Sequence, residues 1–106
     1  MAAYLVANFR LTNPAGYKSY ASVVLPTLEA YGAEILVADY ESEALEGEAG
    51  TVTVVIKFAS NEALSKWYES PAYQKIIHLR TDNTAGIAVA AKEFDLERNL
   101  GILETF

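Results

Sequence analysis

The chain lacks cysteine altogether and has only one histidine among its 106 residues. The absence of cysteine excludes disulfide bonds, thiolate nucleophiles and thiolate ligands for metals. A typical zinc site needs several histidine or cysteine ligands, which this sequence does not provide. We therefore expect no metal site, and we expect any catalysis to proceed without a built-in cofactor.

Basic residues are also scarce, with 8 lysines and arginines against 14 acidic residues and a net charge of −6. Clustered Lys and Arg supply most of the affinity for nucleic acids, so we expect no nucleic-acid partner. Long hydrophobic runs are missing as well. The apolar N-terminal stretch is interrupted by Asn8 and Arg10, so we expect no signal peptide, no membrane span and a cytoplasmic location.

What is present is a regular succession of strand and helix patterns. Alternating or β-branched residues predict four strands, at residues 4–11, 34–39, 51–58 and 86–94. Apolar spacing of three and four residues predicts a helix over 14–31 and a second, interrupted one over 61–80. This βαββαβ order predicts an α+β, ferredoxin-like fold, with a four-stranded antiparallel sheet and two helices on one face. We expect one domain over residues 1–94 and a C-terminal extension over 95–106.

The ends of the predicted helices carry capping residues. Asn13, Ser60 and Ser70 are placed to cap the N-termini, and Ser70 is followed by a proline that restarts the second helix. Gly32 is placed to end the first helix in a left-handed conformation. Pro26 lies inside the first helix and is expected to kink or split it, because it removes one backbone hydrogen bond.

Two helices can cover only one face of the sheet. Strand alternation places Val6, Val55, Ala88 and Ala90 on the other face, which is too apolar to stay exposed to water. A second copy of the chain, related by a two-fold axis, can cover this face with its own. We therefore expect a homodimer formed through the sheet faces.

Several motifs resemble a known family. They are Tyr17-Lys18-Ser19-Tyr20, Tyr31-Gly32-Ala33, Leu45-Glu46-Gly47, Trp67-Tyr68-Glu69-Ser70-Pro71-Ala72-Tyr73-Gln74 and Leu79-Arg80. Over residues 4–94 they resemble the domain of unknown function 1330 family, of the dimeric α/β-barrel superfamily. The resemblance implies ferredoxin-like subunits whose sheets face each other, but no particular activity. The superfamily includes monooxygenases of small aromatics and of haem, muconolactone isomerases, dye-type peroxidases and binding or regulatory modules.

The aromatic–arginine motif is the first candidate site. Trp67 and Tyr73 flank the helix restart, and Arg80 lies seven residues after Tyr73 on the same helical face. These residues can form the wall of a pocket in which Arg80 binds a carboxylate. Alternatively, the two aromatic rings fill the core and Arg80 forms a structural salt bridge.

The second candidate is the sheet face opposite the helices. Strand alternation places Asn8, Arg10, Lys57 and Lys92 there, so three of the eight basic residues share one surface. This surface can form an electropositive cavity for a small anionic ligand. Alternatively, these side chains lie at strand ends and pair with acidic residues across the dimer.

The third candidate comes from resemblance to the haem-degrading monooxygenases of the superfamily. Those enzymes use an Asn on the first strand, a Trp on the second helix and a downstream His that ligates iron. Asn8, Trp67 and His78 follow the same order here. The helical neighbours of His78 are polar, however, which is also typical of an exposed surface histidine.

The sequence thus supports several functions. The leading hypothesis is a cofactor-independent enzyme of the monooxygenase or isomerase type that acts on a small aromatic or carboxylate molecule. The alternative is a non-catalytic module that binds a small molecule or another protein. Haem binding or degradation is a more remote alternative.

Overall fold

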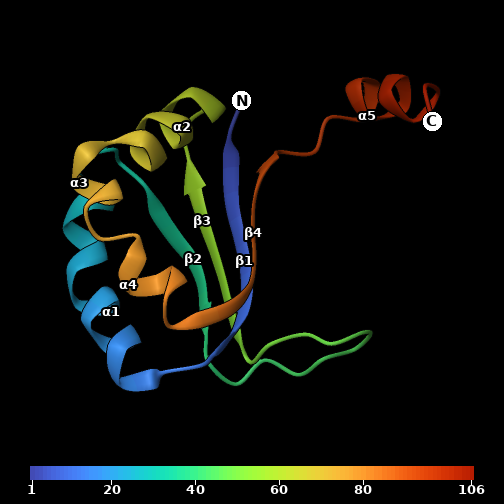
Figure 1. Ribbon diagram of the computed structural model, residues 1–106. Coiled ribbons are helices and arrows are strands. Elements are labelled where there is room, and N and C mark those ends of the chain that lie inside the picture. The colour runs from blue at the N-terminus through green and yellow to red at the C-terminus, as the bar shows by residue number, and fades with distance from the viewer.

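The computed structural model describes residues 1–106 and has a four-stranded antiparallel sheet at its centre (Figure 1). The strands are β1 (Ala3–Leu11), β2 (Glu34–Asp39), β3 (Val52–Phe58) and β4 (Thr84–Lys92), in the spatial order β2-β3-β1-β4. The predicted βαββαβ order and the predicted antiparallel sheet are confirmed.

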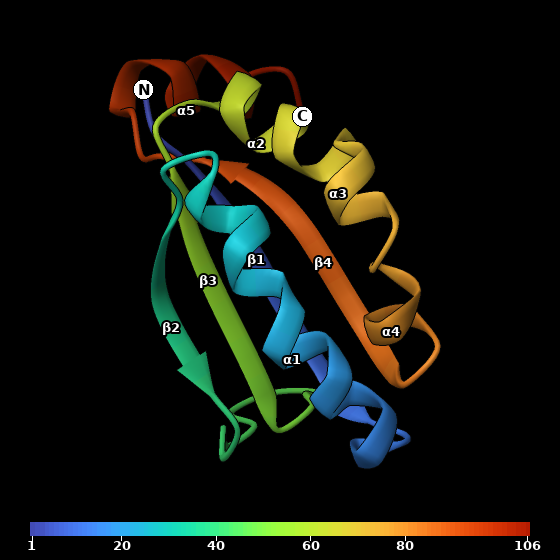
Figure 2. The ribbon, with the colours of Figure 1, turned by 90° about the vertical axis from the view of Figure 1, so that its left-hand side faces the viewer.

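Four helical segments pack on one face of the sheet, which we call the helix face (Figure 2). They are α1 (Pro14–Glu29), α2 (Asn61–Glu69), α3 (Pro71–Gln74) and α4 (His78–Thr81). The predicted second helix therefore consists of three short pieces. The opposite face of the sheet, which we call the open face, has no cover within the chain. The last element, α5 (Leu96–Leu103), stands apart from the helices at the end of β4 (Figure 1).

Capping explains where the helices begin and end. The side chain of Ser60 accepts a hydrogen bond from the backbone N–H of Ala63, at 3.0 Å, and Asn13 caps α1 in the same way. Gly32 has a φ angle of 63°, which confirms the left-handed conformation expected at the end of α1. Pro26 does not split α1, since the helix continues from Pro14 to Glu29.

The core is aromatic and lies between the helix face and the helices. Trp67 and Tyr73 are both fully buried, with ring centroids 4.0 Å apart, and Trp67 also packs on Phe58. The indole N–H of Trp67 donates a hydrogen bond to the hydroxyl of Thr27 at 3.0 Å. This bond joins α2 to α1, so the tryptophan fixes the two helices relative to one another.

The register of β4 corrects one expectation. Ala88 lies opposite Ala7, and Val89 lies opposite Val6. Ala88 and Ala90 therefore lie on the helix face, and Val89 lies on the open face, so the predicted assignment of faces on this strand is wrong. Both sets of residues on β4 are small and apolar, so the pattern alone did not distinguish the two faces.

Lys92 is corrected for the same reason. It lies opposite Ala3, which is buried on the helix face, at the end of β4. The expectation that Lys92 shares one face with Asn8, Arg10 and Lys57 is therefore wrong.

Candidate active site

A cavity of about 210 Å³ lies between α1 and the helix face of the sheet. Its walls are almost entirely apolar, and Arg80 is the only charged residue among those that line it. The lining residues come from β1, α1, β2, β3, α4 and β4, so most of the fold contributes to the cavity. A designed apolar cavity of about 150 Å³ holds benzene, so this cavity has room for one ring with a short substituent.

A local irregularity in β2 helps to form one wall. The pairing of β2 with β3 shifts between Ile35 and Val37, which leaves Leu36 as the extra residue of a β-bulge. Ile35 and Ala38 then both line the cavity, although simple alternation would place them on opposite faces.

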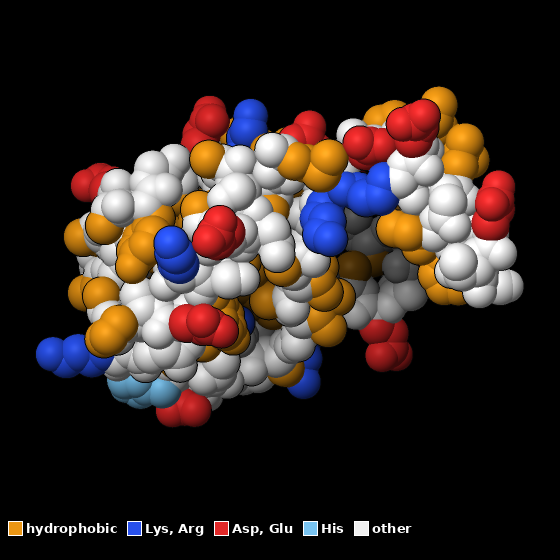
Figure 3. Space-filling view, turned by 90° about the horizontal axis from the view of Figure 1, so that it is seen from above, with side chains coloured by type: hydrophobic (Ala, Val, Ile, Leu, Met, Phe, Trp, Pro, Cys, Tyr) orange, Lys and Arg blue, Asp and Glu red, His pale blue; other side chains and the backbone are white.

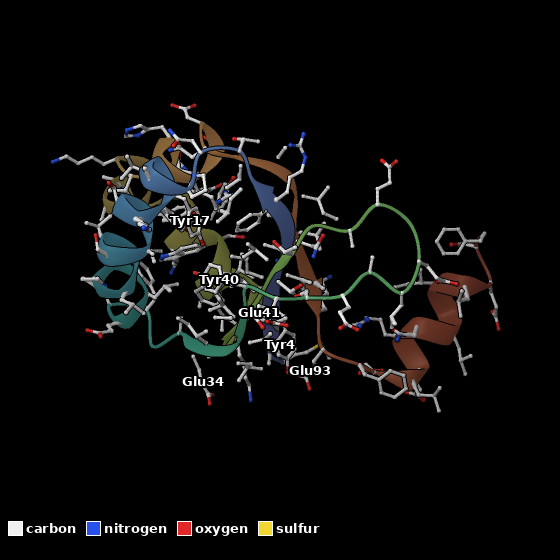
Figure 4. All side chains as sticks on the ribbon, turned by 90° about the horizontal axis from the view of Figure 1, so that it is seen from below. Tyr4, Tyr17, Glu34, Tyr40, Glu41 and Glu93 are labelled. Atoms are coloured by element: carbon white, nitrogen blue, oxygen red, sulfur yellow. The ribbon has the colours of Figure 1, made fainter.

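Tyrosine hydroxyls provide most of the polar groups around the cavity. Tyr17 and Tyr20 lie on α1 and are buried, and Tyr40 follows the end of β2. The hydroxyl of Tyr20 lies 2.9 Å from that of Tyr73, and the hydroxyl of Tyr17 lies 3.5 Å from that of Tyr40. Figure 4 shows Tyr17 and Tyr40 approaching each other from α1 and from the end of β2.

Burial controls the protonation of these phenols. Burial, together with the nearby phenol of Tyr73, raises the pKa of Tyr20 well above its ordinary value. Burial and the hydrogen bond with Tyr40 raise the pKa of Tyr17 in the same direction. Both phenols are therefore neutral at physiological pH and can donate hydrogen bonds, but they do not act as bases.

Arg80 brings a fixed positive charge to the cavity. Its Nε lies 3.4 Å from the hydroxyl of Tyr73. Burial alone lowers the pKa of Arg80, but the phenols of Tyr73 and Tyr20 outweigh it, so the pKa is raised. Arg80 makes no ion pair within the chain, which leaves its guanidinium available to an anionic group in the cavity.

The cavity opens between α1 and β2. Leu25, Ile35 and Tyr40 line it and are also 46%, 40% and 47% exposed. Residues that face both the cavity and the solvent mark its entrance.

The aromatic–arginine motif is divided between the core and this cavity. Arg80 lines the cavity, whereas Tyr73 does not, although its hydroxyl contacts that of Tyr20, which does. Trp67 does not line it, because the indole is fully buried against Phe58 and Tyr73. Ser70 accepts a hydrogen bond from the backbone N–H of Tyr73 at 3.2 Å and so caps α3. The two aromatic rings therefore match the core interpretation, and Arg80 matches the pocket interpretation.

Asn8 holds the loop between β2 and β3. Its Oδ1 accepts a hydrogen bond from the N–H of Gly50 at 2.8 Å. Its Nδ2 lies within hydrogen-bond distance of the carbonyl oxygens of Gly50 and Val52 and of the hydroxyl of Thr53. Since both ends of the amide already have partners, Asn8 has a structural role in this chain.

Acidic residues accompany the two remaining bases of the open face. Arg10 lines a second hollow, of about 360 Å³, together with Glu46 and Glu48. Lys57 lies on β3 directly opposite Glu34 of β2. The predicted electropositive surface is therefore balanced by acids, and its bases lie on the other side of the sheet from Arg80.

The three residues that suggested haem chemistry do not come together. Asn8 lies on the open face, whereas Trp67 is buried among the helices of the other face. His78 begins α4 and is exposed. No group of three His, Asp or Glu side chains in the structure is placed to hold a metal ion.

Sequence reasoning did not single out Tyr17, Tyr20 and Tyr40 as site residues. Tyrosines at helical spacing are typical of a core, and the rings of Tyr17 and Tyr20 do pack there, whereas Tyr40 follows β2 and is half-exposed. The only available signal was chemical, because a buried tyrosine needs a partner for its hydroxyl. Two tyrosines three residues apart on one helix therefore indicate a polar group on the facing element.

The fold and the cavity together define a ferredoxin-like α+β protein with a ligand-sized pocket between its sheet and its first helix. The chain belongs to the family described as domain of unknown function (DUF1330), whose model matches residues 2–94. No protein with curated annotation matches the chain.

Solved structures show the same fold at low sequence identity. A protein of unknown function from Rhodopseudomonas palustris has a TM-score of 0.73 at 15% identity, covering 89% of this chain and 83% of that one. SnoaB, a cofactor-independent oxygenase from Streptomyces nogalater, has a TM-score of 0.57 at 11% identity, covering 89% and 94%. A dimeric protein of unknown function and ferredoxin-like fold from Bacteroides fragilis has a TM-score of 0.59 at 10% identity, covering 88% and 96%. At such identities the likeness shows the fold alone.

Proposed function

We propose that the chain binds a small, mainly apolar molecule with one anionic group, such as an aromatic carboxylate, in the cavity beneath α1. The observation that carries this proposal is an apolar cavity of about 210 Å³ with Arg80 as its only charged lining residue. The apolar walls bury the ring, and the guanidinium binds the carboxylate through charge-assisted hydrogen bonds. The neutral tyrosine hydroxyls orient the polar end of the ligand.

We further propose that the chain is a cofactor-independent enzyme of the monooxygenase or isomerase type. The likeness to SnoaB supports this by analogy of fold. The cavity lining contains no Asp, Glu or His, so the chain offers hydrogen-bond donors and a positive charge rather than a general base. Such a site stabilises a substrate that is already anionic, or an oxyanion that develops during the reaction.

The same lining supports a second candidate, a module that binds the molecule without changing it. A cavity without a titratable base is sufficient for binding. Incubation of the protein with a bound ligand in air, followed by chromatography with mass spectrometry and measurement of oxygen consumption, distinguishes the two candidates, because chromatography also separates an isomer of unchanged mass. An enzyme converts the ligand, whereas a binding module returns it unchanged.

Calorimetry with benzoate and benzamide tests the proposed site. We expect benzoate to bind and benzamide to bind at least tenfold more weakly, because the amide lacks the negative charge. The variant Arg80→Met should lose the preference for benzoate, and Arg80→Lys should retain part of it. Lys18→Met is the matched control, since it removes one positive charge from an exposed position on α1 that does not line the cavity.

A blocking variant tests the location separately. Ala38→Leu adds bulk to a lining position that is exposed enough to tolerate it, and Ala72→Leu adds the same bulk to the exposed surface of α3. We expect only Ala38→Leu to weaken benzoate binding. Equal binding by both variants would place the ligand elsewhere.

We also propose that the chain forms a homodimer through its open face. The open face exposes Ile87, Val89 and Val37 by 67%, 47% and 40%, and burial of such side chains against a second copy is favourable. The dimeric state described for the protein from Bacteroides fragilis supports the proposal.

None of the helices has both the length and the apolar character that a membrane-crossing segment requires. We also propose a cytoplasmic location.

A further inference from the structure

The C-terminal residues 95–106, which we call the arm, form an apolar helix without an apolar partner. Leu96, Leu100 and Leu103 lie four and three residues apart and therefore form one stripe along α5. They are 59%, 52% and 62% exposed, and Phe106 is 93% exposed. Figure 3 shows the arm set apart from the rest of the molecule, with hydrophobic side chains on its surface.

The base of the arm is held by specific hydrogen bonds. Asp95 caps α5 by accepting from the N–H of Arg98 at 3.0 Å. The guanidinium of Arg98 donates to the carbonyl of Glu93 at 2.8 Å and also contacts the sulfur of Met1. These contacts tie the first turn of the arm to the end of β4 and to the N-terminal residue that precedes β1.

A helix of this length requires a surface on which to pack. Isolated helices shorter than about 12–15 residues are marginal in water, and α5 has eight residues, none of them buried. The first turn is well capped, but capping alone does not compensate for an exposed apolar stripe. The stability of α5 therefore depends on a partner that covers the leucines.

The arm projects on the side of the open face. In Figure 1 the helices cover one side of the sheet, while α5 and the loop between β2 and β3 both extend on the other side. In Figure 2, viewed from the helix side, α5 lies beyond the upper end of the sheet and behind α2. A second copy that covers the open face would therefore be flanked by the arm at one end and by the loop at the other.

The distribution of charge indicates which end of a second copy the arm contacts. The arm carries Glu97 and Glu104, and the loop between β2 and β3 carries four further glutamates between residues 41 and 48. Contact between the arm and the loop of a second copy would bring like charges together. Lys57 lies at the same end of the open face as the arm, and it forms no ion pair with Glu34, its neighbour on β2.

We propose that the arm is exchanged in the homodimer, so that α5 of each chain packs its leucine stripe on the second copy, near Lys57 of that copy. This inference rests on the proposed dimer through the open face. The family match ends at residue 94, so the arm lies outside the matched region. It would strengthen the dimer beyond what the sheet faces provide.

Sedimentation equilibrium of the full chain and of three variants tests the proposal. Truncation after Phe94 and the double variant Leu100→Glu with Leu103→Glu should each raise the dimer dissociation constant at least tenfold. Glu29→Gln is the control, because it removes one negative charge from an exposed position at the end of α1, and its dissociation constant should stay within twofold of that of the full chain. Unchanged dissociation constants in both arm variants would overturn the proposal.

The variant Val89→Glu shows whether a negative result contradicts the exchange of the arm alone or the open-face dimer as well. If Val89→Glu is monomeric while the arm variants dimerise as tightly as the full chain, the open-face dimer stands and the exchanged arm is wrong. If the full chain is itself a monomer, both proposals are wrong. Since the chain has no cysteine, a mixture of Lys57→Cys and Leu103→Cys chains adds a direct check, and a crosslink between the two different chains supports the exchange.

Discussion

The variant Tyr73→Phe, which lacks one buried hydroxyl oxygen, tests the hydrogen bonds that join Tyr73 to Tyr20 and Arg80. In Tyr73→Phe, the hydroxyl of Tyr20 loses its partner at 2.9 Å and Nε of Arg80 loses its partner at 3.4 Å. Tyr73 is fully buried and Tyr20 is 7% exposed, so water does not readily replace the lost oxygen. A buried polar group left without a partner costs about 1–3 kcal/mol. We expect the free energy of unfolding to fall by that amount.

Urea denaturation at a fixed protein concentration measures this change, since a dimer would make stability depend on concentration. In a domain of about 100 residues, each kcal/mol lowers the melting temperature by roughly 4 °C or more. Tyr68→Phe is the matched control, because it deletes the same oxygen from a ring that is 38% exposed and whose hydroxyl makes no hydrogen bond. Its stability should change by less than about 0.5 kcal/mol. Equal losses in the two variants would refute the proposed role of the Tyr73 hydroxyl.

Three further predictions concern local structure and pH. Asn8→Ala should lower the free energy of unfolding by about 1–3 kcal/mol, because it removes the partner of the Gly50 N–H, and limited proteolysis should show faster cleavage in residues 40–51. Ser70→Ala should cost about 0.5–2 kcal/mol through the lost cap, and chemical denaturation gives the value; no loss would mean that the cap is dispensable. The pKa values of Tyr17 and Tyr20 are raised, so their contribution to stability is present below pH ~10 and is lost as pH rises above it. Absorbance titration should show these two phenols ionising only as the protein unfolds, and ionisation of all seven tyrosines together near pH 10 in the folded state would contradict this.

The sequence predicted the fold well because periodicity and caps are local signals. Asn13, Ser60 and Gly32 marked helix ends that the structure confirms. The faces of β4 were not predictable in this way, since alanines alternate with Ile87 and Val89 and both sets are apolar. The pairing of β4 with β1 determines which residues of β4 lie on each face of the sheet.

The candidate site was only partly predictable from the sequence. Arg80 is an unusual charge beside an aromatic motif, and its chemistry suggested a ligand in advance. The cavity itself depends on the bulge at Leu36 and on the position of α1 over the sheet. These features depend on long-range packing, which a single sequence does not reveal.

A crystal structure of the protein soaked with benzoate tests the central claim most directly. We expect density for the ring between α1 and the sheet, with the carboxylate within hydrogen-bond distance of the Arg80 guanidinium. A benzoate bound instead on the open face beside Arg10 or Lys57, with the cavity beneath α1 empty, would contradict it.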